Sequence, residues 1–150
     1  MKNNKAIVSV IIVSVAAAAI FYFVANRPKS IKEPASSQAQ QVLSSQTDSQ
    51  GSVTVKVTPK DLLQSSPSWD FEIILDTHSG NLDQDLTKNS VLIGDKDNQY
   101  TPVGWEGDPP QGHHRQGILK FAPITPRPKS IELKINQIGN KERIFKWDLE

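Results

Sequence analysis

The sequence predicts an all-β fold, a seven-stranded antiparallel sandwich preceded by one transmembrane helix and a disordered linker. Three observations lead to this prediction. Residues 6–25 are uncharged and almost wholly apolar, and a stretch rich in serine and glutamine follows them. From residue 53 onward, apolar and polar residues alternate, which is the periodicity of half-buried strands.

The apolar run from Ala6 to Ala25 has the length of a membrane span. A helix of 20 residues is about 30 Å long, which matches the hydrocarbon core of a bilayer. The apolar core of a cleaved signal peptide is about 7 to 15 residues long, so an uncleaved anchor is favoured over a signal peptide. Basic residues flank the run on both sides, and the charge rule alone is nearly balanced. A five-residue head before the helix and a polar linker after it favour a cytoplasmic head at residues 1–5 and an extracytoplasmic carboxyl-terminal domain.

Residues 26–51 are expected to form a disordered linker. They contain Pro28, Pro34 and many serine and glutamine residues, with few apolar side chains to offset the entropy of ordering the chain. The linker and the β-domain at residues 52–150 would together stand on one side of the membrane.

The domain at residues 52–150 contains seven segments with strand character. Apolar and aromatic residues recur at alternate positions, and proline, glycine and asparagine mark the turns between them. The expected strands lie near residues 53–58, 69–76, 91–93, 100–105, 118–121, 131–135 and 145–149, with the third and fourth forming a hairpin.

Seven short strands in about 100 residues suit an antiparallel sandwich of the immunoglobulin type. The order of a Trp-x-Phe-x-Ile strand, a hairpin, the segment Gly117–Pro123 and the segment Lys129–Ile135 resembles uncharacterised membrane-anchored immunoglobulin-like domains of prokaryotic cell-envelope proteins. The resemblance covers residues 51–150. It implies an architecture and a location, and it carries no catalytic motif.

Composition excludes several classes of function. The chain has no cysteine, so disulfides, thiolate metal sites and CxxC redox chemistry are excluded. Five basic residues stand against two acidic ones before residue 51, and twelve against fourteen after it. No basic stripe appears in the β-domain, so nucleic acid is not an expected partner.

The loop from Trp105 to Arg115 holds two carboxylates and two of the three histidines. His113 and His114 would combine with His78 and with Asp108, Glu106 or Asp76 in a zinc or copper(II) site if the two loops lie at one end of the sandwich. Adjacent side chains on a strand face opposite ways, so His113 and His114 reach one ion only from a loop conformation.

Three further interpretations of this loop stay open. The histidines can be surface or loop-supporting residues without a ligand, Arg115 can capture an anion, and Trp105 at a strand end can contact a partner. No nucleophile elbow or other catalytic signature is present, so the sequence predicts a binding or structural module of the cell envelope rather than an enzyme. Its partner would be a protein or an envelope polymer, and no cofactor is expected apart from the alternative metal.

Overall fold

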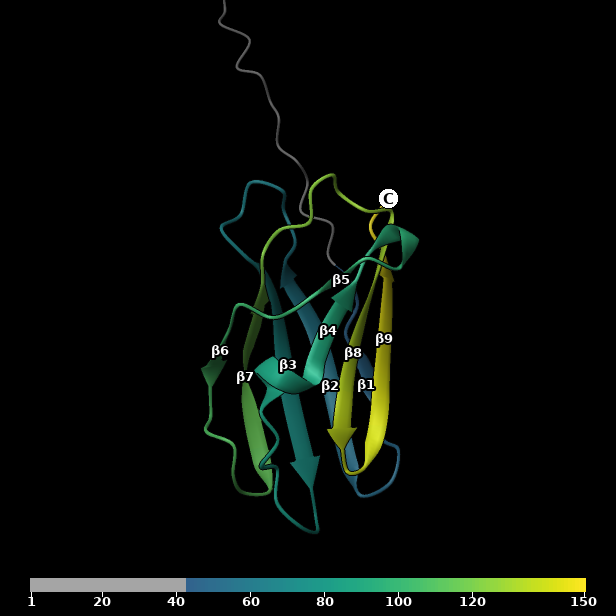
Figure 1. Cartoon of the computed structure of the whole chain (residues 1–150). Coiled ribbons are helices and arrows are strands. Elements are labelled where there is room, and N and C mark those ends of the chain that lie inside the picture. The colour runs from purple at the N-terminus through teal and green to yellow at the C-terminus, as the bar shows by residue number, and fades with distance from the viewer. Residues whose placement is uncertain (1–42) are drawn as a thin grey trace, which may run out of the picture. The chain divides into compact units, whose positions relative to one another are not determined.

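The structure is a computed structural model that describes residues 43–150, and this part of the chain is built almost entirely from antiparallel strands (Figure 1). The prediction of an all-β antiparallel fold is confirmed. The elements are β1 (Gln46–Asp48), β2 (Val53–Asp61), β3 (Trp69–Thr77), α2 (Leu86–Asn89), β4 (Ser90–Ile93), η1 (Asp95–Asp97), β5 (Gln99–Tyr100), β6 (Gly104–Gly107), β7 (His114–Phe121), β8 (Ser130–Ile138) and β9 (Lys141–Asp148).

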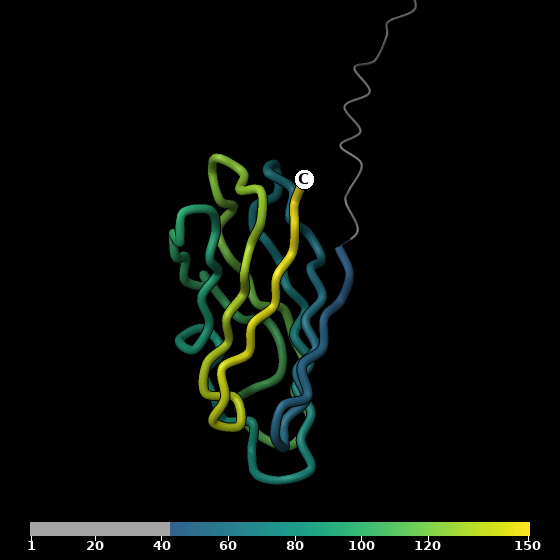
Figure 2. The backbone as a smooth tube through the Cα atoms, turned by 90° about the vertical axis from the view of Figure 1, so that its right-hand side faces the viewer, coloured from purple at the N-terminus to yellow at the C-terminus, as the bar shows by residue number. Residues whose placement is uncertain are grey.

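The strands of the described residues form two sheets. One sheet has the order β1-β2-β3-β7-β6, and the other has the order β5-β4-β8-β9. All neighbouring pairs are antiparallel. Figure 2, turned by 90°, shows the two layers lying against each other, and Figure 1 places the β8–β9 turn at the end opposite the C-terminus.

Residues 43–150 contain nine strands, where seven were expected. The segment at residues 100–105, predicted as one strand of a hairpin, is divided between the two sheets. Tyr100 pairs with Leu92, whereas Trp105 pairs with Leu119 in the other sheet. Pro102 lies between them and has no N–H to donate to a ladder, so the chain leaves one sheet there and crosses to the other.

The second strand that was not expected, β1, lies inside the segment that was predicted to be the linker. The predicted boundary at residue 51 is therefore wrong. Gln46 to Asp48 pair with β2 from Val57 to Val55. Leu43 packs against the core. The three residues of β1 are all polar, so no apolar alternation distinguishes them from their serine- and glutamine-rich neighbourhood, and the contacts that order β1 come from distant strands.

The core lies between the two sheets and is filled from both. An aromatic cluster joins the layers, with Phe71 of β3 at 5.7 Å from Phe121 of β7 and at 5.8 Å from Trp147 of β9 (ring centroids). Trp147 also stacks on Phe145 at 6.3 Å. Trp69 and Trp147 are 0% and 5% exposed.

Side chains join β1 to β9, across the two sheets. The carboxamide of Gln46 donates to the carbonyl of Lys146 and accepts from its N–H at 3.2 Å. The Gln46 carboxamide thus makes the two hydrogen bonds with Lys146 of β9 that a backbone peptide group of a neighbouring strand would make. The indole N–H of Trp147 donates to the carbonyl of Ser44 at 2.8 Å. Because each sheet ends at one of these strands, the contacts close one side of the sandwich.

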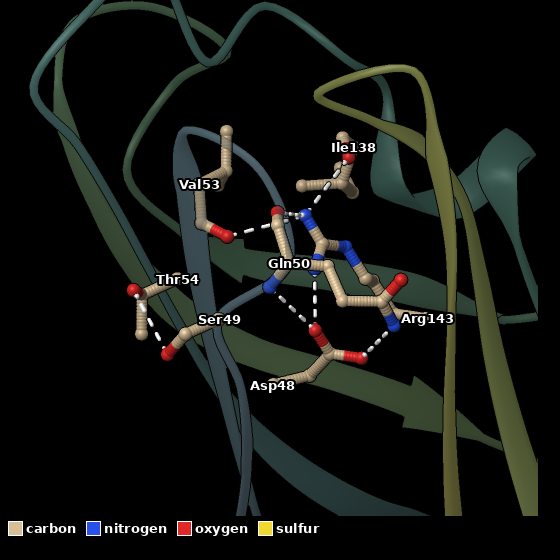
Figure 3. A network of polar contacts seen from close by, with 7 residues as sticks. All are labelled: Asp48, Ser49, Gln50, Val53, Thr54, Ile138 and Arg143. Carbon is tan, nitrogen blue, oxygen red and sulfur yellow. Dashed lines mark hydrogen bonds and ion pairs between the residues drawn. The ribbon is translucent and has the colours of Figure 1, made fainter.

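A buried arginine completes this junction at the end of the β8–β9 turn (Figure 3). Arg143 is 0% exposed, forms an ion pair with Asp48 and donates to the carbonyl of Gln50. It also donates to the carbonyls of Val53 at 3.1 Å and Ile138 at 3.3 Å. One side chain of β9 therefore fixes β1, the β1–β2 turn and the end of β8.

The stability of the domain should depend on the ionisation of Asp48. Burial alone would raise the pKa of Asp48, but hydrogen bonds from Gln50 and the Arg143 guanidinium outweigh it, so the pKa lies below its ordinary value of 3.8. A carboxylate with a depressed folded-state pKa contributes stability above its unfolded pKa and loses it as the pH falls through the folded value.

We therefore expect the free energy of unfolding to decrease as the pH is lowered below about 4. The decrease should be less steep in Asp48→Asn than in the unchanged chain. Urea unfolding curves across this range measure it. The exposed Asp83→Asn is the control and should keep the full acid dependence. Equal slopes for Asp48→Asn and the unchanged chain would contradict the role of Asp48.

Within residues 43–150, no helix has the length and apolar character needed to cross a bilayer. The predicted membrane helix at Ala6–Ala25 and most of the predicted linker lie outside the described residues.

Candidate functional site

The two histidine-bearing loops lie side by side at the end of the domain that also carries the β8–β9 turn (Figure 1). The N–H of Leu82 donates to the carbonyl of Gly112 at 2.9 Å, and the N–H of Thr77 donates to the carbonyl of His113 at 2.9 Å. A metal site shared by the two loops would require this arrangement. The backbone contacts bring the loops together without any ligand.

The structure pairs one of the three histidines with a carboxylate. Nδ1 of His114 lies 2.6 Å from Oδ1 of Asp76, its direct cross-strand neighbour on the outer face of the sheet. His78 and His113 are exposed, and His113 precedes the first residue of β7.

The predicted carboxylate ligands have other contacts. Oδ2 of Asp108 accepts the N–H of Gln116 at 2.8 Å, and Glu106 forms an ion pair with Lys120 at 2.9 Å. Among residues 43–150, no three histidine, aspartate or glutamate side chains gather closely enough to hold a metal ion. The metal site therefore stays a prediction, with the His114–Asp76 pair as its nearest structural counterpart.

Arg115 lies on the inner face of its sheet and is 3% exposed. Its guanidinium donates to the carbonyls of Gln84 at 2.6 Å and Asp108 at 3.2 Å. Burial lowers the pKa of Arg115, and the nearby carboxylates of Asp85 and Asp108 act in the opposite direction. Arg115 thus joins the two loops from their buried side, and its role as a contact residue for a partner or anion stays a prediction.

Trp105, the other predicted partner-binding residue, is half-buried and covers a pair of facing glycines. Its indole N–H donates to the carbonyl of Asp108 at 2.9 Å, and the guanidinium carbon of Arg115 lies 5.0 Å from the ring centroid. A Cβ on Gly117 would lie 2.6 Å from the ring and 2.7 Å from the Cα of Gly107. The two glycines leave the space that the indole fills, which buries part of a ring that would otherwise be free for a partner.

Gly117→Ala should therefore lower the free energy of unfolding by about 2 kcal/mol, because the added methyl group overpacks the space beneath Trp105. The displaced indole should also shift the tryptophan emission to longer wavelength, since the other two tryptophans are buried.

Gly104→Ala in β6, the edge strand that pairs with β7, is the matched control, because a Cβ at that position would have no neighbouring atom within 4 Å. It should change stability by less than about 0.5 kcal/mol. Equal effects of the two substitutions would contradict the packing of Trp105 on the glycine pair.

Arg115 was a candidate site residue from the sequence, but the burial of neither Arg115 nor Arg143 was predicted, although the alternation along the strands indicates it. Arg115 stands at an alternate position with Leu119 and Phe121 in β7, so it faces the same side of the sheet as they do. Arg143 stands in the same relation to Phe145 and Trp147 in β9. Both arginines therefore point inward at the starts of their strands.

The fold and these contacts define a class of protein, an all-β domain of two antiparallel sheets whose loops at one end are held by buried arginines. Comparisons with family models, curated proteins and solved structures find no match.

Proposed function

We propose that this chain is a single-pass membrane-anchored protein whose immunoglobulin-like domain stands outside the cytoplasm as a binding or structural module of the cell envelope. The observation that carries the proposal is the uncharged apolar run from Ala6 to Ala25, placed before a separate β-domain. A domain held at a membrane surface by one helix is suited to contact a protein or polymer partner of the envelope.

The strand order supports the immunoglobulin-like assignment. In that fold, strands A, B, E and D form one sheet, and strands C, F and G form the other. The order β2-β3-β7-β6 corresponds to A-B-E-D, and β4-β8-β9 corresponds to C-F-G. In this assignment β5 takes the position of the additional strand C′, and β1 is an extension at the edge beside β2.

Fractionation of cells that express the full chain tests the anchoring. We expect the chain at its full length in the membrane pellet after an alkaline carbonate wash, and its release by detergent. Immunoblotting against a carboxyl-terminal tag gives both readings. A soluble product shortened by about thirty residues would overturn the proposal, because it would show that the apolar run is a cleaved signal.

A second candidate function is divalent metal binding, favoured by the 2.6 Å contact between His114 and Asp76. A metal bound to the folded state must raise the melting temperature. The main proposal expects no change in the melting temperature of the full chain with saturating zinc or copper. An increase that His114→Ala abolishes would establish the metal site in its place.

A further inference from the structure

A polar basin of about 610 Å³ lies beside the β8–β9 turn. Four of the residues that line it carry a carboxamide side chain: Asn89 at the end of α2, Asn136 and Gln137 in β8, and Asn140 in the turn. None of the interpretations drawn from the sequence includes these residues.

The backbone at Gln137 holds a conformation that glycine favours. Its φ is 63°, in the left-handed region that costs non-glycine residues about 1–2 kcal/mol. A β-bulge places it there, since two residues of β8, Asn136 and Gln137, stand opposite Glu142 between the Ile135 and Ile138 pairs. The side chain of Gln137 is exposed, so packing into the core does not explain it. Backbone strain at an exposed side chain points to a function for that side chain.

The turn brings a second residue with a carboxamide side chain to the same basin. Gly139 and Asn140 have φ values of 59° and 57°, the pattern of a two-residue hairpin turn with both central residues left-handed. Glycine at position 140 would meet the same requirement, yet asparagine stands there and lines the basin.

The charges around the basin nearly balance. Lys88 forms an ion pair with Asp85 at 3.0 Å, and the neighbouring Lys141 and Glu142 carry opposite signs. Among the described residues, no aromatic or aliphatic side chain lines the basin. The surface is therefore polar with little net charge, and it suits neither a polyanion nor an apolar ligand.

Carboxamides both donate and accept hydrogen bonds, as the hydroxyl groups of a sugar do. We propose that this basin binds an uncharged, hydroxyl-rich saccharide chain, with Gln137 and Asn140 as its principal contacts. The inference deepens the proposed binding role and rests on it for the source of the ligand. The β8–β9 turn, beside which the basin lies, is at the opposite end of the domain from the C-terminus (Figure 1).

Nuclear magnetic resonance of the full, ¹⁵N-labelled chain in detergent micelles tests the proposal without depending on where the protein resides. Maltotetraose and tetra-N-acetylchitotetraose are the probes, and they distinguish a plain from an acetamido-bearing glycan. We expect one of them, at millimolar concentration, to shift the amide signals of residues 136–141. No shift there with either probe, or a stronger shift there with polyphosphate or with a tetra-alanine peptide, would overturn the proposal.

Variants separate binding from folding. Gln137→Gly relieves the backbone strain, so its melting temperature should stay the same or rise, while its affinity for the active probe should fall about fivefold, the worth of roughly one hydrogen bond. Asn140→Gly should behave in the same way. Lys96→Gly is the matched control, because Lys96 also has a left-handed φ of 59° but lies away from the basin, and it should keep the full affinity. Unchanged affinity in Gln137→Gly and Asn140→Gly would overturn the assignment.

Discussion

Trp147→Ala should lower the free energy of unfolding by about 4 kcal/mol, the cost of removing a large aromatic side chain from a packed core. Trp147 is 5% exposed, lies against Phe71 of the opposite sheet and stacks on Phe145. Its indole N–H also holds the carbonyl of Ser44. Alanine would therefore leave a cavity in the core and release the chain just before β1.

Urea unfolding, followed by circular dichroism, measures this loss. Trp147→Phe is the matched control, because it keeps an aromatic ring in the core but cannot donate to Ser44. It should cost about 1–2 kcal/mol. If Trp147→Ala costs no more than Trp147→Phe, the last strand does not contribute its side chain to the core as described.

Asp48→Ala should lower the free energy of unfolding by about 3 kcal/mol. Asp48 is the only carboxylate that pairs with Arg143 among the described residues, and Arg143 is fully buried. Removing one partner of a buried ion pair leaves an uncompensated charge, which typically costs about 3–5 kcal/mol. The three carbonyls that remain around Arg143 favour the lower part of that range.

Two variants show whether this cost arises from the unpaired charge. Glu150→Ala breaks an exposed ion pair with Lys129 and should cost less than about 1 kcal/mol. The double variant Asp48→Ala with Arg143→Met removes the buried charge as well, so it should recover part of the loss of Asp48→Ala. A double variant less stable than Asp48→Ala would contradict this explanation.

The strands of the core could be predicted because their sequence carries the period of the sheet. In β3, Trp69, Phe71, Ile73 and Leu75 alternate with polar residues, and all four are buried. The same alternation identified the centres of β2 and β8. β8 and β9 are joined by the turn at Gly139 and Asn140, whereas β3 pairs with β7 and β4 pairs with β8 across long stretches of sequence.

The ends of the strands, and β1 as a whole, could not be predicted from this pattern. β1 has no apolar side chain, and its order comes from Arg143 and Lys146, about a hundred residues away in the sequence. β7 begins at His114 with four residues that lack the apolar alternation, since Arg115 and Gly117 occupy the inward positions. An arginine at an inward-facing position breaks the apolar alternation of the sequence, although its side chain faces the core as an apolar residue there would.

The position of the candidate site could be predicted from the sequence, but the contacts of its side chains could not. The loops of His78 and His113 meet, as a shared site would require, but Arg115 is buried beneath them and Trp105 is engaged with glycines. The polar basin lay outside every motif, because a bulge and a turn create it. The left-handed φ values of Gln137 and Asn140 are visible only in the folded backbone.

In the topology that we propose, the β-domain stands outside the cytoplasm on an uncleaved amino-terminal helix. The chain has no cysteine, so single introduced cysteines report their location without interference. Gln111→Cys, in the exposed β6–β7 loop, should react with a membrane-impermeant maleimide in intact cells, whereas Asn3→Cys should react only after lysis. Labelling of Asn3→Cys but not of Gln111→Cys in intact cells would contradict the account.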